Sequence, residues 1–381
     1  MGVSGIDERE ELRRTVRAFL AEHADEAALR RAMESTVGHD PDVWRRFAGE
    51  LGVTGLAVPE EYGGAGGIAE LGVVCAEAGR VLMCGPFLST ALAGQVILAS
   101  GDAEACAAYL PGIAAGETVA TVAVAEADGR WRTSAQTSAD TSHTSAARRG
   151  DGGWTLSGTK WFVTDGMTAD LVLVAASTDD GPQVFAVRTD AVGLTRRPLA
   201  TLDLTRRQAR LDLDAVPARR VAAPDGAALV DHTLDVAATL LSIEQAAGAR
   251  WLLEATTAYA RDRVQFGRPI GSFQAVKHKL ADVLVSVESA HSAAYRALDM
   301  WATGDPEFPL VASLAKAYCS EAYLHAAHEA VQLHGGIGFT WEHPAHLYLK
   351  RARSTHELFD PPSVHRARMA ELLSVESGLP H

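Results

Sequence analysis

Two carboxylates, Glu244 and Asp360, stand in contexts that raise a question about their role. Glu244 lies in the apolar run Leu-Leu-Ser-Ile-Glu-Gln-Ala-Ala-Gly, where an unpaired carboxylate would be costly to bury. That placement makes Glu244 a functional candidate; the alternative is a structural ion pair with an arginine. Asp360 is followed by two prolines, which also suits a residue that caps the start of a terminal helix. The chemistry in question is general-base catalysis by a carboxylate.

The histidines and cysteines do not form a metal-binding pattern. Five histidines fall between positions 325 and 346, and His325 and His328 could share one helix face. A metal would also need a carboxylate or cysteine partner at a set geometry, so we expect no metal site. The four cysteines include no Cys-x-x-Cys pair, which indicates a reduced, cytoplasmic setting. Cys84 and Cys106 are expected to be small core residues.

The segment Tyr259–Val287 combines arginines, aromatic residues and glycines. Residues 259–263 close a helix with basic side chains in the last turn, which suits the negative end of the helix dipole. Phe266-Gly267 and the Pro-Ile-Gly at 269–271 mark a break. An apolar stripe at helical spacing then runs from Ile270 to Val287. Periodicity alone predicts a helical hairpin.

Length, composition and charge exclude several classes of protein. The chain has 381 residues, of which 47% are hydrophobic, enough for two or three structural units. Its formal net charge of −13 argues against nucleic acid or an anionic membrane as the main partner. No apolar run reaches the roughly 18 residues of a membrane span. The N-terminal segment has no apolar signal-peptide core.

The hydrophobic period changes twice along the chain, which predicts an α+β protein. Helical spacing is expected over 5–24, 41–52, 68–100 and 103–116. Strand-like segments follow at 118–126, 154–164, 169–177, 183–188, 194–204 and 207–215, with a long surface loop at 129–153. Helices return at 226–262, 272–302 and 308–334, and after Pro344 and Pro362. The expected domains are a helical one at 1–117, a β domain at 118–224 and a helical one at 225–381.

General cofactor motifs such as GxGxxG, the phosphate-binding loop and HExxH are absent, but several longer strings are specific in combination. Besides 259–287, these are PEEYGGAG at 59–66, KWFVTDG at 160–166 and VQLHGGIGFTWEHPAHLYLKRAR at 331–353. With the helical–β–helical order, they resemble the acyl-CoA dehydrogenase family of flavoproteins over nearly the whole chain. The resemblance implies a middle β-barrel or sandwich, a C-terminal four-helix bundle and FAD as cofactor.

The resemblance implies that the 259–287 segment contacts FAD bound mainly by a neighbouring subunit. Arg263 would hold the pyrophosphate, which suits a planar guanidinium that is always charged. Phe266 would pack on the adenosine part, and Gln274 would hydrogen-bond the same region. Without the resemblance, Arg263 is a helix-terminal charge and Phe266 is a core residue.

Two further FAD contacts are implied. Gln332, Gly335 and Gly336 match a segment where glycine lets the backbone approach the dinucleotide closely; the alternative for the two glycines is a helix stop. Phe162 and Thr164 match an aromatic–hydroxyl pair beside the isoalloxazine, where threonine can hydrogen-bond the flavin N5 edge.

The reaction implied is removal of two hydrogens across Cα–Cβ of an acyl thioester. A carboxylate removes the Cα proton while the Cβ hydride goes to flavin N5. The family's usual base is the Glu of Tyr-Glu-Gly-Thr, and alignment through Arg351 puts Asp360 at that place. Aspartate is one methylene shorter, about 1.5 Å of reach, and a misplacement of ~1 Å can cost on the order of 100-fold in rate.

Other family members carry the base on the long helix before the FAD arginine. The matching position, 26 residues before Arg263, is Ala237, which cannot act as a base. Glu244 lies seven residues further on, nearly two turns, and so points to much the same side about 10 Å along the axis. Both Glu244 and Asp360 are therefore candidate bases.

A second departure from the family pattern lies at 125–140, which reads AEADGRWRTSAQTSAD. Glu126 matches the Glu of the family's Thr-Glu-Pro-Gly-Ala-Gly-Ser-Asp, but the Pro-Gly-Ala-Gly-Ser part is missing. This departure bears on thioester binding more than on flavin binding.

Three functions are compatible with these features. The first is FAD-dependent dehydrogenation of an unusual acyl group, ring-bearing or carrier-bound, presented by CoA or an acyl-carrier protein, with an electron-transfer flavoprotein-like acceptor. The second is a non-catalytic or FAD-sharing subunit of a hetero-oligomeric acyl-CoA dehydrogenase. The third is a related flavin oxidase, such as a nitroalkane oxidase, with an aspartate base. Because FAD contacts come from two subunits in the family, a homo- or hetero-tetramer is expected.

Overall fold

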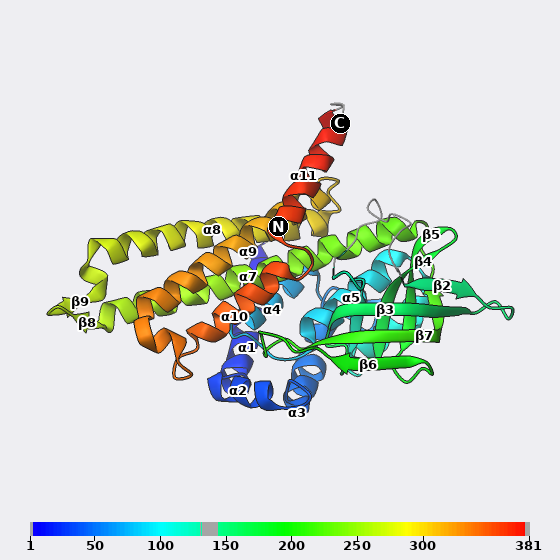
Figure 1. Ribbon diagram of the computed structural model, residues 1–381, viewed down its shortest axis with the longest axis horizontal. Coiled ribbons are helices and arrows are strands. Elements are labelled where there is room, and N and C mark those ends of the chain that lie inside the picture. Colours follow the sequence, from blue (N-terminus) through cyan, green and yellow to red (C-terminus); the bar gives the residue numbers. More distant parts are fainter. Residues whose placement is uncertain (1–2, 130, 132–143, 378–381) are drawn as a thin grey trace. The chain divides into compact units, whose positions relative to one another are not determined.

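The computed structural model describes residues 3–129, 131 and 144–377 (Figure 1). These residues form two compact units, each built from separate stretches of the chain. Unit 1 comprises Met1–Leu29, Gly72–Met83 and Ala238–His381, and unit 2 comprises Arg30–Leu71 and Cys84–Ala237.

Unit 2 contains a seven-stranded sheet among the described residues. Its strands are β1 (Ala120–Ala123), β2 (Ser145–Arg148), β3 (Trp154–Thr164), β4 (Leu171–Thr178), β5 (Gly181–Arg188), β6 (Leu194–Pro198) and β7 (Gln208–Val221). The pairings run β4–β2–β3–β7–β5 and return to β4, so five strands close on themselves. The parallel strand β1 is added on β4, and β6 on β7. Closure leaves few free sheet edges.

Alternating side chains of the strands fill the interior of this sheet. Leu156 and Val163 of β3, Phe185 of β5 and Leu211 of β7 are all fully buried there. The β-branched and aromatic content of these segments favours strands, and one face of each strand supplies the core.

Short helices complete unit 2. They are α3 (Pro41–Arg45), α5 (Phe87–Ser100) and α6 (Ala103–Ala114), together with parts of α2 (Glu26–Glu34) and α4 (Ile68–Arg80). Helix α5 is tied to the sheet because the amide of Ala120 donates to Thr90 Oγ1 at 3.3 Å. Asp102 caps α6 by accepting from the amide of Ala105 at 3.0 Å, and it also accepts from the amide of Ala222 at 2.9 Å. These hydrogen bonds fix α5 to β1 and α6 to the end of β7.

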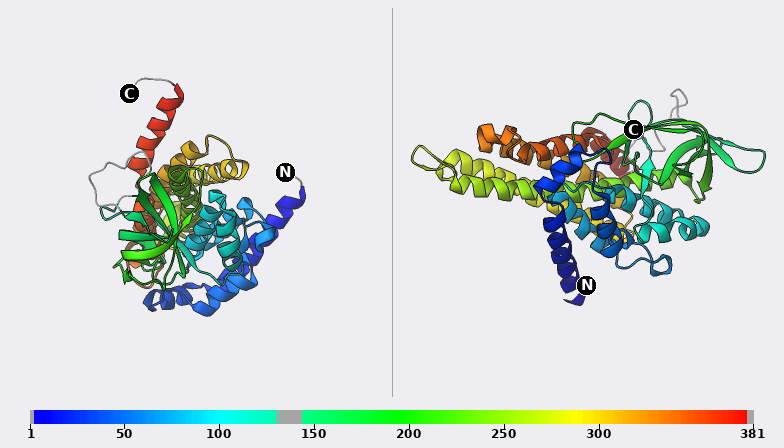
Figure 2. Two further views of the ribbon diagram at one scale, coloured as in Figure 1. Left: turned by 90° about the vertical axis from the view of Figure 1, so that its right-hand side faces the viewer. Right: turned by 90° about the horizontal axis from the view of Figure 1, so that it is seen from below.

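Unit 1 is helical. It contains α1 (Val3–His23), most of α4 and of α7 (Gly226–Asp262), then α8 (Gln274–Thr303), α9 (Phe308–His334), α10 (Ala345–Glu357) and α11 (Pro362–Ser377). Helices α8 and α9 run side by side (Figures 1 and 2). Small residues face the core on both, including Ala290 and Ala294 on α8 and Ala315 and Ala322 on α9, which lets the two backbones approach closely. By length and composition α7 could cross a membrane, but 78% of its most apolar window is buried in the protein.

Several predicted elements match the structure, and others differ. The predicted strand 194–204 ends at Pro198, and the predicted helix 41–52 is α-helical only to Arg45 and continues as a π-helical turn to Glu50. Helices 226–262 and 308–334 have the predicted bounds. The predicted loop 129–153 contains strand β2, whose residues are mostly exposed and so lack an apolar alternation; residues 130 and 132–143 of that loop lie outside the described part. Helix α2 was not predicted. Helix α8 starts at Gln274, because residues 270–272 form a 3-10 turn and Phe273 is extended.

Candidate functional site

Phe162 and Thr164 lie near the end of β3, where the strand leaves regular pairing. β3 pairs with β7 at Lys160 and again at Val163, with a shift of register between them. Phe162 has φ of 53°, a left-handed conformation that is strained for a bulky residue. Bulges redirect side chains and are frequent beside active sites. The backbone thus displays Phe162 in a way that regular pairing would not allow.

The hydroxyl of Thr164 has an unmet hydrogen-bonding capacity. Its Oγ1 is buried and makes no hydrogen bond within the described part of the chain, although the Thr164 carbonyl accepts from Thr121 Oγ1 at 2.6 Å. The next residue, Asp165, is held by Ser89 Oγ, which donates to its carboxylate at 2.7 Å. A buried hydroxyl without a partner is uncommon, and a polar edge of a bound group would satisfy it.

Glu126 is engaged by a buried lysine. Lys160 Nζ donates to Glu126 Oε1 at 2.5 Å and to the Val124 carbonyl at 2.9 Å. The other Glu126 oxygen accepts from the amide and the hydroxyl of Thr144. Burial lowers the pKa of Lys160, and the Glu126 carboxylate acts in the opposite direction. Most of the segment 125–140 that departs from the family pattern lies outside the described residues.

The end of α7 leads into a short hairpin, and three predicted flavin contacts, Arg263, Phe266 and Gln274, lie in it or beside it. Strands β8 (Val264–Gln265) and β9 (Arg268–Pro269) pair antiparallel, and the turn residues Phe266 and Gly267 have φ of 54° and 74°. Two left-handed residues make a tight turn that fits the twist of a hairpin. Phe266 is 92% exposed, so it is not a core residue of this chain. Arg263 and Gln274, the first residue of α8, are also exposed.

The end of α9 carries the second predicted contact. After His334 the chain turns at Gly335, which has φ of 64° and open space where a side chain would project. Tyr259 near the end of α7 packs its ring 4.3 Å from the ring of His334. The α9 end with Gln332, Gly335 and Gly336 therefore lies at the same end of unit 1 as the hairpin (Figures 1 and 2).

Exposed aromatic and apolar side chains gather in the same two segments. Besides Phe266 they include Val264 at 53%, Phe339 at 80% and Trp341 at 59% exposed. Apolar surface of this kind on a monomer marks an interaction site. The chain thus presents glycine backbone, an arginine and aromatic rings together at one end of unit 1.

Glu244 forms a buried ion pair. Arg351 Nη1 on α10 donates to Glu244 Oε1 on α7 at 2.6 Å, and the two side chains are 1% and 9% exposed respectively. Helix α4 crosses α7 at this point, because a Cβ at Gly79 would lie 2.6 Å from the Glu244 carbonyl oxygen. The pair with an arginine is the alternative interpretation of Glu244, and its role as a base stays a prediction.

Asp360 lies in a strained turn between α10 and α11. Phe359 and Asp360 have φ of 57° and 72°, two consecutive left-handed residues of which neither is glycine. His365 Nε2 bonds the Phe359 carbonyl at 2.8 Å, and Lys316 Nζ donates to the Asp360 carbonyl at 3.0 Å. The amide of Val364 donates to the Pro361 carbonyl at 3.0 Å, so the hydrogen bonds of the first turn of α11 begin at Pro361. Two buried side chains thereby hold the turn that presents Asp360.

These two side chains have strongly shifted pKa values. Burial lowers the pKa of Lys316 to about 7, and the charge of Asp360 acts against that shift. Burial also lowers the pKa of His365 to about 3, and the nearby Lys316 adds to the effect. Lys316 also donates to Ser320 Oγ at 3.0 Å, which exchanges hydrogen bonds with the amide of Gln245. The turn is therefore part of a buried polar network that reaches α7.

The structure thus brings the predicted residues together in groups. Arg263, Phe266 and Gln274 share one end of unit 1 with the α9 terminus, and Phe162 and Thr164 share the β3 bulge of unit 2. Sequence reasoning missed Lys316 and His365. The signal for Lys316 was a lysine on a helix face of small residues, with Ala312, Cys319 and the potential partner Ser320 as neighbours.

These features fit FAD. The Thr164 hydroxyl has no hydrogen-bond partner among the described residues, Gly335 leaves its backbone open to a close approach, and Phe266 presents an exposed ring. By contrast, the described residues contain no group of three or more His, Cys, Asp or Glu side chains that could hold a metal ion.

Comparison with known proteins gives the family. The family models "Acyl-CoA dehydrogenase, N-terminal domain", "middle domain" and "C-terminal domain" match residues 6–117, 129–216 and 224–373. The acyl-CoA dehydrogenase IpdE2 of Mycolicibacterium smegmatis is 37% identical over 93% of this chain and 96% of its own. IpdE2 of Mycobacterium tuberculosis is also 37% identical, over 93% of this chain and 94% of its own.

Solved structures agree. A variant of the Tcur3481-Tcur3483 steroid ACAD has a TM-score of 0.89 and 34% identity, and covers 98% of this chain and 99% of its own. The ChsE4-ChsE5 complex from Mycobacterium tuberculosis has a TM-score of 0.86 and 27% identity, over 96% of this chain and 97% of its own. The chain belongs to the acyl-CoA dehydrogenase family, whose members are FAD-containing oxidoreductases that act on CH–CH groups.

Proposed function

We propose that this protein dehydrogenates a ring-bearing acyl-CoA at Cα–Cβ and passes the electrons to an electron-transfer flavoprotein-like acceptor. The observation that carries the proposal is the similarity to a steroid ACAD over 98% of the chain, at 34% identity. The intact flavin-contact residues support it. The departure at 125–140 supports an acyl group unlike a simple straight chain. CoA is the proposed carrier; a carrier-protein thioester is the alternative.

The chain's own residues would divide the work as follows. Arg263, Phe266 and Gln274, with Gln332 and the Gly335-Gly336 pair, would hold FAD between subunits. Bound FAD supplies the acceptor for the Cβ hydride. The Thr164 hydroxyl would hydrogen-bond its polar edge, and Phe162 would pack beside the ring.

Asp360 is the proposed base. It is buried, and the carbonyls of Asp360 and Phe359 accept hydrogen bonds from Lys316 and His365. These bonds fix the backbone position from which the shorter aspartate side chain extends. Removal of a proton from a weak carbon acid requires a positioned general base, and a buried carboxylate is suited to that role. Glu244 remains the second candidate, but its carboxylate is already paired with Arg351.

A second candidate function is that of an FAD-sharing subunit in a mixed oligomer. Two of the structural relatives are named as pairs of different chains. The exposed aromatic residues around the hairpin support a partner at that end of unit 1. In this case Arg263 and Gln274 would serve FAD in a neighbour, and Asp360 would have no catalytic duty.

The two functions are distinguished by measuring FAD per chain in two preparations. In one the protein is purified alone, and in the other it is co-expressed with a neighbouring dehydrogenase gene. A yellow protein with one FAD per chain when purified alone supports the self-sufficient enzyme. A colourless protein that becomes soluble and yellow only with its partner supports the shared site. A protein that stays free of flavin in both preparations contradicts both.

A further inference from the structure

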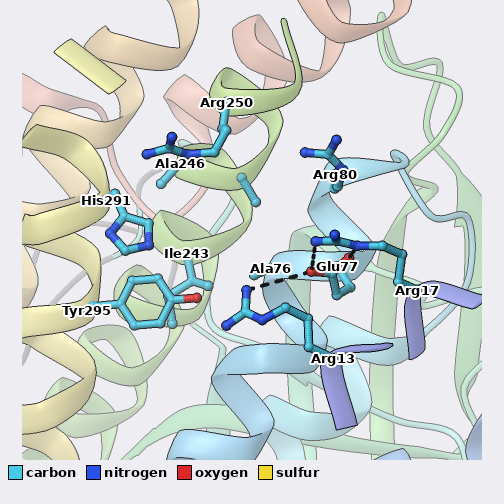
Figure 3. Close-up of a pocket in the computed structure, with 11 residues that line it drawn as sticks. Arg13, Arg17, Ala76, Glu77, Arg80, Ile243, Ala246, Arg250, His291 and Tyr295 are labelled. Carbon is cyan, nitrogen blue, oxygen red and sulfur yellow. Dashed lines mark hydrogen bonds and ion pairs between the residues drawn. The ribbon is translucent and has the colours of Figure 1, made fainter. Parts of the chain in front are cut away.

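A cavity of about 80 Å³ lies inside unit 1, between helices α1, α4, α7 and α8 (Figure 3). Space of this size holds several water molecules. Four arginines line it, Arg13, Arg17, Arg80 and Arg250, but only one carboxylate, Glu77. None of these residues belongs to the proposed flavin contacts or to the candidate bases. Three of these arginine side chains are only about 30% exposed, whereas Arg17 is 54% exposed. Such a cluster of guanidinium groups around an open space calls for anionic partners.

Glu77 satisfies only the two arginines of α1. Its two oxygens accept from Arg17 Nε and Nη2, each at 2.8 Å, and Arg13 Nη1 lies 3.8 Å away. This is a bidentate pair on a carboxylate that is only 4% exposed. In Figure 3 the pair occupies one side of the cavity. Glu77 is therefore not free to neutralise Arg80 or Arg250.

Within the described part of the chain, the carboxylates that pair with Arg80 and Arg250 are about half exposed to solvent. Arg80 Nη2 lies 2.5 Å from Glu254, whose side chain is 49% exposed. Arg250 Nη2 lies 2.9 Å from Glu288, whose side chain is 54% exposed. Exposed ion pairs of this kind are weak and are screened by salt. Both guanidinium groups can therefore turn toward a ligand in the cavity at little cost.

The opposite wall supplies neutral hydrogen-bond donors. The rings of His291 and Tyr295 on α8 stack with centroids 4.4 Å apart and face the arginines (Figure 3). Burial lowers the pKa of His291, Arg250 and Arg13 lower it further, and Glu288 opposes them. Burial raises the pKa of Tyr295, so its hydroxyl keeps its proton at neutral pH. With the acceptors of Glu77 already used, the wall offers mainly donors.

We propose that this cavity binds a small tetrahedral oxyanion of the phosphate class, either free or as the end group of a phosphomonoester. Arg80 and Arg250 bind its oxygens, and His291 and Tyr295 donate hydrogen bonds to it. The planar guanidinium fork matches such an oxyanion better than any neutral ligand. A bound anion would also join α4, α7 and α8 at a point distant in sequence from the flavin contacts. The proposal does not depend on the acyl substrate.

Titration calorimetry on the full-length, flavin-loaded protein tests the site, with inorganic phosphate, glycerol phosphate and chloride compared at constant ionic strength. Inorganic phosphate is expected to bind at one site per chain, and chloride is not. Arg250→Gln and, separately, Arg80→Gln should each weaken phosphate binding roughly tenfold or more, because each removes a charge-assisted hydrogen bond. Arg366→Gln is the matched control. It removes the same charge from an exposed pair with Glu321 on the surface of the same unit and should leave binding unchanged.

The outcomes divide cleanly. If both inorganic phosphate and glycerol phosphate bind, the site accepts the end group of a phosphomonoester. If only inorganic phosphate binds, the site is specific for the free ion. The pKa of His291, followed by NMR, should rise when phosphate binds, because the anion offsets the neighbouring arginines. The proposal is overturned by absence of saturable phosphate binding, by full affinity in both the Arg80 and the Arg250 variants, or by an equal loss in the Arg366 variant.

Discussion

Glu244 and Asp360 are both buried carboxylates of unit 1, but their surroundings differ. Glu244 is matched by the guanidinium of Arg351 at 2.6 Å. Asp360 sits in a turn in which Lys316 bonds its backbone carbonyl and His365 bonds the carbonyl of Phe359. We propose that Glu244 stabilises the structure through its ion pair and that Asp360 accepts the proton. The first prediction separates these two roles.

Asp360→Asn is expected to slow flavin reduction by substrate by roughly 100- to 10,000-fold, the usual contribution of a general base, while FAD stays bound. Glu244→Gln is expected to lower the free energy of unfolding by about 3–5 kcal/mol, because it leaves the Arg351 charge buried without its partner. Stopped-flow flavin absorbance and urea denaturation of both variants check this. Asp360 is excluded as the base if its variant reduces flavin at the wild-type rate.

Lys316 gives the protein a pH-dependent stability of predictable sign. Its pKa is about 7 in the folded chain, against 10.5 for a lysine side chain exposed to water. Between these values the unfolded chain binds the proton that the folded chain releases, so the contribution of Lys316 to the free energy of unfolding rises with pH. The rise is at most about 1.4 kcal/mol per pH unit, and below pH 7 the contribution is constant.

Urea denaturation from pH 6 to 10 of wild type and Lys316→Met measures this contribution. The stability of wild type relative to the variant should increase with pH above about 7. Lys350→Met, a lysine on α10 that is only half-buried, serves as the control and should show no such trend. A difference between wild type and Lys316→Met that is flat with pH would contradict a buried lysine with a lowered pKa.

Buried residues whose partners are distant in sequence could not be assigned from the sequence alone. The proposed flavin-contact residues could be selected from the sequence because they sit in long specific strings. Lys316 and His365 act through backbone carbonyls of a distant turn, and no local pattern shows which carbonyls those are. Arg351 was used only to align Asp360, and its pairing with Glu244 depends on how α10 packs on α7.

At the scale of elements, the hairpin between α7 and α8 is the proposed flavin-binding segment. Its left-handed turn leaves Phe266 92% exposed, outside the chain's own core. The sequence predicted the two helices and the break between them. It did not predict the pairing of β8 with β9 or the start of α8 at Gln274, because a two-residue strand pair carries too few residues to show a period.

Arg263→Gln should weaken FAD binding by roughly 10- to 100-fold, because a hydrogen bond between charged groups contributes about 1.5–3 kcal/mol. Arg261→Gln is the matched control, since it removes another exposed arginine, in the last turn of α7 and two residues before Arg263. FAD retained per chain after gel filtration, with thermal unfolding as a check on the fold, measures both. Equal retention by the two variants would remove Arg263 from the flavin site.

For the strands of unit 2, the sequence pattern also predicted some features, while others depend on how the strands pair. Strand β3 was predicted with its observed bounds, 154–164, because turn residues separate it from the neighbouring strands. The bulge at Phe162 was not predicted, because it arises from a register shift against β7. Strand β2 was missed because its pairing with β3, rather than an apolar face, holds it in place.

At the scale of the whole molecule, family membership fixes the cofactor and the reaction class, and the departures concern the substrate. The three family models cover nearly the whole chain. The flavin-contact segments are kept, while the base position and the segment 125–140 differ. The most direct consequence is that the protein should reduce its flavin with a bulky acyl-CoA and not with a short straight one.

One experiment tests this central claim directly. The flavin-loaded protein, purified with any partner that it needs, is mixed anaerobically with steroid-ring-bearing and with straight-chain acyl-CoA esters. The account predicts loss of oxidised-flavin absorbance with the ring-bearing ester, together with a product lighter by two hydrogens, and little or no loss with butyryl-CoA. Flavin that stays oxidised with every acyl-CoA ester, in a protein that binds FAD, would contradict it.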